Sequence, residues 1–277
     1  MYPTLFRLGP LTLHSYGLMM ALGFLSALWI WGRLSRHTGY SADLLSTLLF
    51  WMLISGLLGA RLLHVLQYWE DFAANPVSIL RIDQGGLVFF GGAIGAGLAL
   101  VCFARRHRKP LLEVMDLVST ALPLGHAWGR LGCFLNGCCH GRVCEATIGA
   151  VRFPGGSLPW QRYPDGARSL PLIPTQLIEV FGNLAIFLVL YRLFPRRPFR
   201  GAIAGLYLLL YPLLRFLVEP LRGDLRPGLG SLSNGQWISL GLMVLGIGIL
   251  LIGHRLFPIL PESDKTTDKQ CAKRTKP

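Results

Sequence analysis

The chain has 277 residues, of which 52% are hydrophobic and only 15% are charged, and its mean hydropathy is +0.47. Soluble globular proteins carry about 25% charged residues, so these values exclude a soluble fold and an intrinsically disordered chain. The formal net charge of +13 would suggest a nucleic acid partner in a soluble protein. The basic residues are instead placed along the chain as membrane topology requires, and no nucleic acid partner is expected.

Seven apolar segments are long enough to cross a bilayer as helices, which takes about 20 residues. The first is expected to be a retained span and not a signal peptide, because only Arg7 precedes it and no small-x-small cleavage site follows. The expected spans are residues 15–32, 44–67, 87–104, 112–129, 174–191, 201–219 and 236–254. The sequence therefore predicts an all-α polytopic membrane protein with about seven transmembrane helices.

Lys and Arg alternate between the two sides of these spans. The segments after the first, third, fifth and seventh spans are rich in basic residues, and the short segments on the other side hold few. Because cytoplasmic loops carry excess Lys and Arg, the N-terminus is expected outside and the C-terminus in the cytoplasm.

This topology divides the chain into an integral membrane domain and a tail. The domain covers residues 1–257 and contains a periplasmic loop or small head region at about 137–173. Residues 258–277 are polar and Lys-rich, and form a cytoplasmic tail that is expected to be disordered and to contact anionic lipid head groups.

Ionisable side chains inside apolar segments are costly at membrane depth and mark candidate sites. Arg61 lies within the second span, and Arg130 directly follows the fourth. Arg215 and Glu219 lie four residues apart, so they share one helix face and can pair. The structural alternative for Arg215 and Glu219 is a pair that only neutralises its own charge. The structural alternative for Arg61 is a side chain that extends to the membrane interface. With Arg222, however, several arginines face one acid, and the excess positive charge suits a phosphate.

Glycines are frequent inside the spans: Gly56 and Gly59 lie in the second, and Gly91, Gly92, Gly95 and Gly97 lie in the third. This pattern favours close packing of two helices through small residues. The alternative is a cleft in which a lipid approaches the backbone.

A cysteine cluster formed by Cys133, Cys138, Cys139 and Cys144 follows the fourth span. Metal binding would use the thiolates and His140. A disulfide, Cys133 with Cys138 or Cys139 with Cys144, is compatible with an oxidising outer side. The third interpretation is that these small, weakly polar side chains line a site, and the sequence leaves the three open.

Five short elements, in order, resemble the prolipoprotein diacylglyceryl transferase family, with similarity from about residue 6 to residue 255. They are Leu13-His-Ser-Tyr-Gly-Leu18, Gly85-Gly-Leu-Val-Phe-Phe-Gly-Gly92, Gly129-Arg-Leu-Gly-Cys-Phe-Leu-Asn-Gly-Cys138, Pro174-Thr-Gln-Leu-Ile-Glu179 and Arg215-x3-Glu219-x2-Arg222. The chain departs from the family pattern at three positions. Phe90 replaces the usual histidine, Cys133 the signature asparagine and Cys138 the signature glutamate, which makes the signature a cysteine-rich variant.

The resemblance implies a reaction in which the diacylglyceryl group of phosphatidylglycerol moves to the cysteine thiol of a prolipoprotein signal peptide. A thioether forms and glycerol phosphate leaves. The implied partners are phosphatidylglycerol, signal peptides and membrane lipid, and no metal or redox cofactor is required. The implied location is a bacterial inner (cytoplasmic) membrane, with the active site toward the periplasmic leaflet.

The same resemblance assigns candidate roles. Arg130 and Arg215 are expected to stabilise the leaving phosphate, and Glu219 to orient Arg215. Arg61 and Arg222 are expected to support this pair in binding the lipid. Tyr16 is expected to act in catalysis by a hydrogen bond to the head group or to a developing charge, and Asn136 to bind the glycerol hydroxyls.

The resemblance leaves the general base unassigned, because Phe90 cannot accept a proton. His126, one turn before Arg130, and His140 are the candidates. The alternative is that no dedicated base exists and the arginines lower the pKa of the acceptor thiol.

Three rival functions remain at this point. The closest is a divergent family member that uses the same lipid donor with a different acceptor. A transporter would also contain buried arginines and intramembrane glycines, but no repeat relates the two halves of the chain. A membrane metal or redox protein rests on the cysteine cluster alone.

Overall fold

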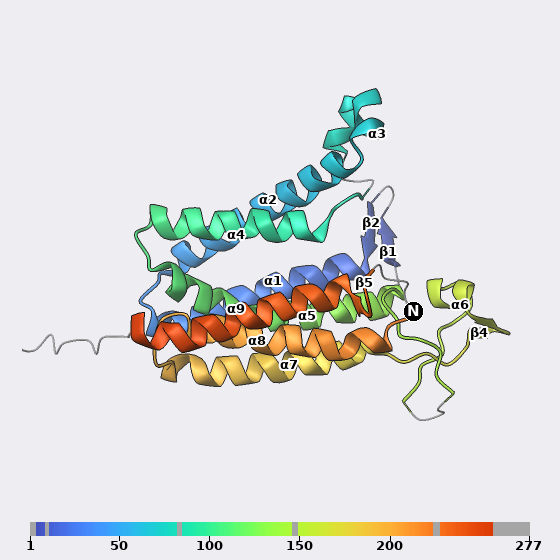
Figure 1. Cartoon of the computed structure of the whole chain (residues 1–277). Coiled ribbons are helices and arrows are strands. Elements are labelled where there is room, and N and C mark those ends of the chain that lie inside the picture. Colours follow the sequence, from blue (N-terminus) through green and yellow to red (C-terminus); the bar gives the residue numbers. More distant parts are fainter. Residues whose placement is uncertain (1–3, 9–10, 82–84, 146–148, 224–227, 257–277) are drawn as a thin grey trace, which may run out of the picture.

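Seven long helices form the body of the protein and run along a common direction (Figure 1). This computed structural model describes residues 4–8, 11–81, 85–145, 149–223 and 228–256, so the predicted cytoplasmic tail lies outside the described residues. The long helices are α1 (Ser15–Leu34), α2 (Ala42–Gln67), α4 (Phe89–Arg106), α5 (Leu111–Asn136), α7 (Thr175–Leu193), α8 (Ala202–Val218) and α9 (Asn234–Leu256).

Six of these helices are long and apolar enough to cross a membrane, which confirms an all-α polytopic membrane protein. The exception is α5, which carries Glu113, Asp116, His126 and Arg130. The prediction of seven crossings, and that of the orientation of the termini, stay predictions.

Shorter elements join the long helices at their ends. They are β1 (Thr4–Leu8), β2 (Leu11–His14), α3 (Trp69–Ala74), α6 (Leu158–Arg162), β3 (Pro164–Asp165), β4 (Arg168–Ser169), β5 (Gly228–Leu229), β6 (Leu232–Ser233) and the 3₁₀ turns η1 (Ser35–His37), η2 (Pro76–Leu80), η4 (Phe194–Arg196) and η5 (Glu219–Leu221). The strands pair as three antiparallel hairpins, β1–β2, β3–β4 and β5–β6.

Helix α5 lies at the centre of the bundle, where it packs against α1, α7 and α8. Its apolar face joins a core that includes Trp31, Leu48, Leu117 and Leu190. Large apolar side chains also cover the outside of the long helices, as expected of a surface that faces lipid. Examples with high exposure are Leu25, Leu58, Leu62, Ile94, Leu98, Phe181, Leu217, Val244 and Leu251.

The pair α2–α4 confirms the prediction of close packing through glycine. A Cβ atom on Gly91 would lie 2.2 Å from the Gly59 carbonyl oxygen, and one on Gly95 would lie 2.1 Å from the Ser55 carbonyl oxygen. The backbones of the two helices are therefore in direct contact, and any side chain at these positions would separate them.

The fourth predicted span ends too early, because α5 continues from the expected end at residue 129 to Asn136. Arg130 does not end the helix, since its charge is paired inside the bundle with Glu179. The helix ends about two turns later at Gly137, which has a left-handed conformation (φ 82°) and whose N–H donates a hydrogen bond to the Cys133 carbonyl.

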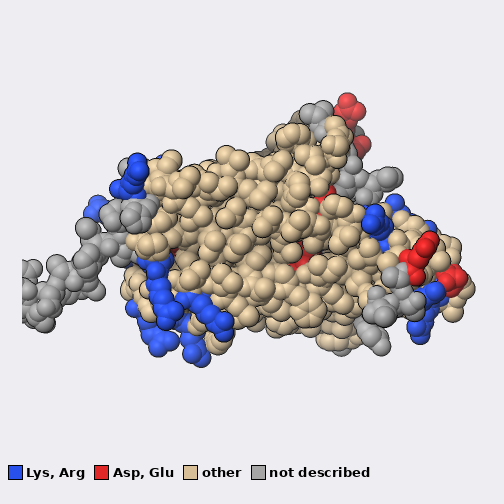
Figure 2. All heavy atoms as spheres, turned by 60° about the horizontal axis from the view of Figure 1, so that its bottom comes forward, with Lys and Arg blue, Asp and Glu red and all other residues tan. Residues whose placement is uncertain are grey.

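The long loop after α5 forms a small head at one end of the bundle, built from α6 and the β3–β4 hairpin (Figure 1). Phe153 is fully buried in it, and Trp160 donates a hydrogen bond to the Gly166 carbonyl. Figure 2 shows Lys and Arg gathered at the opposite end, and a wide belt with few charged atoms between this end and the head, where both signs of charge occur. Helices α1, α4 and α7, whose last turns carry basic residues, all end on that side (Figure 1), so the basic segments after the first, third and fifth predicted spans lie together.

Asp116 fixes the start of α8 against α5. Its two carboxylate oxygens accept hydrogen bonds from the backbone N–H groups of Gly201 (2.8 Å) and Ala204 (2.9 Å), and Arg197 Nε lies 3.5 Å away. The carboxylate is fully buried and satisfies orphan donors at a helix N-terminus, where negative charge is favourable. This contact sets the position of α8, which carries Arg215 in its last turn.

Candidate functional site

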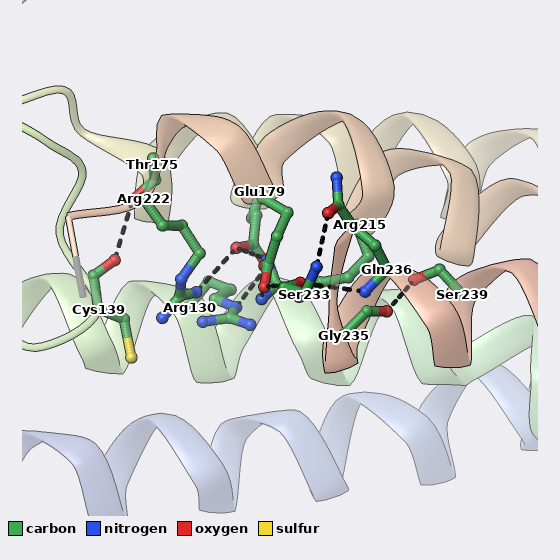
Figure 3. A network of polar contacts seen from close by, with 11 residues as sticks. Arg130, Cys139, Thr175, Glu179, Arg215, Arg222, Ser233, Gly235, Gln236 and Ser239 are labelled. Atoms are coloured by element: carbon green, nitrogen blue, oxygen red, sulfur yellow. Dashed lines mark hydrogen bonds and ion pairs between the residues drawn. The ribbon is translucent and has the colours of Figure 1, made fainter. Parts of the chain in front are cut away.

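The buried carboxylate of Glu179 on α7 gathers three arginines from different elements (Figure 3). Its Oε2 atom lies 2.7 Å from Nε of Arg130 on α5, and its Oε1 atom lies 3.6 Å from Nη1 of Arg215 on α8. Nη1 of Arg222, just after η5, is 3.4 Å from the same Oε1. The structure therefore brings together three of the four arginines that the sequence singles out. We call these three arginines, with Glu179 and with Glu219, the partner of Arg215, the arginine cluster.

Glu219 holds Arg215 from the other side, as the four-residue spacing predicts. The two side chains form an ion pair, and Glu219 Oε1 also accepts a hydrogen bond from the Ser233 hydroxyl (2.7 Å). A Cβ atom on Gly235 would lie 3.1 Å from Glu219 Oε1. The first residues of α9 thus close over this carboxylate and fix its orientation.

The cluster holds two acids, not the single acid that the sequence interpretation counted. Three guanidinium groups against Glu179 and Glu219 leave one net positive charge. The exposed fraction of the side chain is 20% for Arg130, 13% for Arg215 and 2% for Arg222. Arg130 is therefore the arginine that an anionic ligand reaches most easily, and Arg222 is placed to position Glu179.

Tyr16 and Asn136 lie at the edge of this cluster next to the cysteines. The Tyr16 ring packs so closely on α5 that a Cβ atom on Gly132 would lie 2.9 Å from it. Its hydroxyl interacts electrostatically with Arg130 and with the thiols of the cysteine cluster. Asn136 interacts with the Cys138 thiol. Tyr16 and Asn136 therefore both lie beside the cysteine thiols.

The first turn of α7 anchors the segment that contains Cys138 and Cys139. The Gln176 amide donates a hydrogen bond to the Cys138 carbonyl (2.8 Å), and the Thr175 hydroxyl donates one to the Cys139 carbonyl (2.9 Å). Hydrogen bonds from the Cys133 and Cys138 thiols, together with Arg222, lower the pKa of the Cys139 thiol and outweigh the opposing effect of burial.

The two histidine candidates occupy different environments. His126 packs between the rings of Tyr211 (4.5 Å between centroids) and Tyr207 (6.4 Å), and its buried Nδ1 atom has no hydrogen-bond partner among the described residues. His140 is held in the head, where its Nδ1 atom lies 3.0 Å from the Gly141 carbonyl oxygen. His126 interacts electrostatically with Arg130. Neither ring forms a hydrogen bond or ion pair with the arginine cluster in the described part of the chain, and the assignment of a base stays a prediction.

Arg61 is not part of the arginine cluster. Each of its five N–H donors goes to a backbone carbonyl in the connection between α2 and α4. The acceptors are Ser78, Ile79, Arg81, Gly85 and Gly86. In this arrangement Arg61 organises a loop and keeps no donor for a phosphate, so its predicted role as a lipid ligand has no support from the geometry.

The comparison with known proteins agrees with the resemblance drawn from the sequence. Residues 3–252 match the family described as prolipoprotein diacylglyceryl transferase. The chain belongs to this family.

Curated relatives extend over nearly the whole chain. The phosphatidylglycerol–prolipoprotein diacylglyceryl transferase of Pseudoalteromonas translucida is 36% identical over 260 residues, which cover 91% of this chain and 93% of the relative. The protein of the same name from Proteus mirabilis is 34% identical over 282 residues, covering 95% and 96% of the two chains. That from Xanthomonas oryzae pv. oryzae is 36% identical over 281 residues, covering 94% of each.

Three of the five elements that resemble the family meet in the arginine cluster. The signature element supplies Arg130, the element Pro174–Glu179 supplies the anchoring residues and Glu179, and the last element supplies Arg215, Glu219 and Arg222. The element with Phe90 belongs instead to the α2–α4 pair, and the Phe90 ring is 53% exposed.

The disulfides considered from the sequence are not present in the described chain, where Cys102, Cys133, Cys138, Cys139 and Cys144 are free thiols. Sequence reasoning also missed Glu179 as a site residue, although it is an acid inside a predicted span. The criterion that selected Arg61 and Arg215, an ionisable group at membrane depth, would have found it.

Proposed function

We propose that this protein transfers the diacylglyceryl group of phosphatidylglycerol to the lipobox cysteine of prolipoproteins, the first step of bacterial lipoprotein maturation. The family match over residues 3–252 supports the reaction class. The curated relatives carry the name phosphatidylglycerol–prolipoprotein diacylglyceryl transferase. One observation supports the assignment of this reaction to particular residues: three arginines converge on Glu179, beside Tyr16 and the signature segment.

The chemistry requires stabilisation of a leaving phosphate. The acceptor thiolate attacks the glyceryl carbon that bears the phosphate ester, a C–S bond forms, and the C–O bond breaks with its electron pair on the phosphate oxygen. Glycerol phosphate leaves with one more negative charge than the ester had. Preorganised guanidinium groups stabilise this developing charge.

The arginines have distinct tasks in this proposal. Arg130, the most exposed of the three, contacts the phosphate directly, and Arg215 assists it under the control of Glu219. Arg222 is almost fully buried and keeps Glu179 in place. Tyr16 and Asn136 contact the glycerol hydroxyls from the side of the head.

The same proposal gives the orientation of the protein. The basic end of the bundle (Figure 2) faces the cytoplasm, because positive loops remain on that side. The arginine cluster lies near the ends of α5 and α8 and the start of α7, and these are the helix ends next to the head (Figure 1). The site therefore opens to the outer leaflet of the inner membrane, where the signal peptides of exported prolipoproteins are presented.

A direct transfer assay tests the function. Purified protein in detergent receives phosphatidylglycerol and a peptide with a lipobox cysteine, and mass spectrometry follows the peptide. We expect a mass gain of one diacylglyceryl group, its absence with a Cys-to-Ser peptide, and a loss of about 10²–10³-fold in rate for Arg130→Ala, as for removal of one oxyanion donor.

The matched control is Arg192→Ala, which removes an exposed arginine from the last turn of α7, far along the helix from Glu179. We expect its rate to remain within twofold of the original. Folded protein that binds phosphatidylglycerol but modifies no peptide would contradict the proposal and direct the search to other acceptors.

A further inference from the structure

The thiols of Cys133, Cys138 and Cys139 form a compact group between α5 and the head. Their three sulfur atoms all lie within 4.8 Å of one another, and each side chain is partly exposed. We propose that these three thiolates bind a zinc ion with an open fourth position, and that this position takes the thiolate of the acceptor cysteine. The second half of this inference rests on the proposed function, whereas the metal site does not.

The spacing of the sulfurs fits a tetrahedral ion. Zn–S bonds of about 2.3 Å hold neighbouring sulfurs about 3.8 Å apart. The observed limit of 4.8 Å therefore requires each sulfur to move by at most about 1 Å, which side-chain rotation supplies. Three protein ligands and one open position are the usual arrangement of a catalytic zinc site, whereas structural zinc sites have four protein ligands.

The backbone holds the ligand segment in place without help from an ion. The Cys133 carbonyl accepts a hydrogen bond from the Cys138 N–H (3.1 Å), which folds the chain back onto the last turn of α5. The Gln176 amide and the Thr175 hydroxyl donate hydrogen bonds to the carbonyls of Cys138 and Cys139. Cys139 has a positive φ of 61°, a conformation that is uncommon outside glycine and marks functional sites. The three sulfurs are thus presented by a preorganised loop.

The number of sulfurs favours a metal over a disulfide. A disulfide would join two of the three thiols and leave the third without a role, whereas zinc uses all of them. His140, which the sequence interpretation offered as a further ligand, is placed against Phe153 and Tyr163 and lies outside the group. The donor set is therefore three sulfurs, which suits zinc and other thiophilic ions.

The surrounding charges match such a site. Zinc with three thiolates carries one net negative charge, and the neighbouring arginine cluster carries one net positive charge. Arg222 interacts with the Cys139 thiol while it pairs with Glu179, and such outer contacts orient metal ligands. Arg130 also interacts with Cys133, so the ion would lie next to the phosphate-binding arginine.

A zinc ion at this position would supply the thiolate that the reaction needs. A free cysteine thiol has a pKa of about 8.5 and is mostly protonated at neutral pH, and coordination to zinc removes its proton. The acceptor releases this proton to water, and its sulfur then forms the C–S bond as the C–O bond to phosphate breaks. The neutral thioether product would bind zinc more weakly than the thiolate does and would leave the site.

Metal content and cobalt spectroscopy test the site. We expect about one zinc ion per chain in purified protein and less than a tenth of that in Cys133→Ser, Cys138→Ser or Cys139→Ser. The control is Cys144→Ser, which removes a nearby cysteine outside the group and should keep the full metal content. Since a serine variant can fail to fold, cobalt is also titrated into metal-stripped original protein, where thiolate-to-cobalt charge-transfer bands should appear.

The acceptor position is tested with the same cobalt form. A lipobox peptide with cysteine should shift the charge-transfer bands, and its serine counterpart should not. Absence of zinc together with absence of cobalt binding, or a disulfide among the three cysteines by mass spectrometry without reductant, would overturn the site. Transfer that persists at full rate in metal-stripped protein would overturn the catalytic role and leave the proposed function intact. Stoichiometric metal without transfer would instead contradict the function and leave the metal site standing.

Discussion

Nε of Arg130 lies 2.7 Å from Oε2 of Glu179, and this pair joins α5 to α7 where the segment Cys138–Cys139 rests on the first turn of α7. Because Glu179 also faces Arg215 and Arg222, one carboxylate neutralises charges from three elements. The geometry of the phosphate site therefore depends on a residue that need not contact the substrate.

Glu179→Gln should both destabilise the protein and abolish transfer. The amide keeps the shape of the side chain but removes the buried negative charge that three guanidinium groups share. Removal of one partner from a buried ion pair costs about 3–5 kcal/mol. Thermal unfolding in detergent measures the loss, and the peptide assay measures transfer.

The control for this variant is Asp165→Asn, which breaks the exposed pair between Arg152 and Asp165 in the head. Exposed pairs contribute about 0–1 kcal/mol, so its unfolding temperature should hardly move. A Glu179→Gln protein as stable and active as the original would show that the arginines do not depend on this carboxylate.

Arg130→Lys should lower the transfer rate at least tenfold and change stability less than Glu179→Gln does. Lysine keeps one positive charge but cannot make the two parallel hydrogen bonds of a guanidinium with phosphate. Steady-state kinetics with varied phosphatidylglycerol separates the effect on kcat from that on KM. A variant with unchanged kcat/KM would exclude a direct contact between Arg130 and the phosphate.

The helices could be predicted because a long apolar segment in a membrane can adopt few structures other than a helix. The end of α5 could not be predicted, because Arg130 looks like a residue at a membrane boundary until its partner Glu179 is known. The ion pair of Arg215 with Glu219 follows from local spacing and is confirmed. Contacts within one helix are thus accessible to sequence reasoning.

Contacts between helices are less accessible. Arg61 and Arg130 look alike in the sequence, yet one holds a loop and the other lies in the arginine cluster. The sulfurs of Cys133, Cys138 and Cys139 meet only because Gly137 reverses the chain after α5. These differences depend on which segments face one another, and residue type alone does not determine that.

Asp116→Asn should destabilise the protein through the start of α8. Gly201 and Ala204 donate to different carboxylate oxygens, and in an amide one of these positions becomes an NH2 donor that faces an N–H group. The substitution also removes the negative charge next to Arg197. Loss of a helix cap costs about 0.5–2 kcal/mol, and the lost buried charge adds to that.

The matched control is Glu113→Gln, three residues earlier on the same helix. Glu113 Oε2 lies 3.0 Å from Arg200 Nε, and the Arg200 side chain is 44% exposed. Its effect on unfolding should be within about 1 kcal/mol. If the two variants unfolded alike, the buried cap at Asp116 would contribute no more to stability than a surface pair.

Gly91→Ala should weaken the contact between α2 and α4, because the added Cβ atom would lie 2.2 Å from the Gly59 carbonyl oxygen, which is backbone and cannot rotate away. Overpacking of this kind costs about 1–3 kcal/mol. Gly97→Ala on the same helix is the control, since nothing lies within 4 Å of its Cβ position, and alanine favours the helix by about 1 kcal/mol over glycine. Thermal unfolding in one detergent should therefore move in opposite directions for the two variants. A shift of equal sign and size would mean that helix propensity, and not the α2–α4 contact, determines the effect of both substitutions.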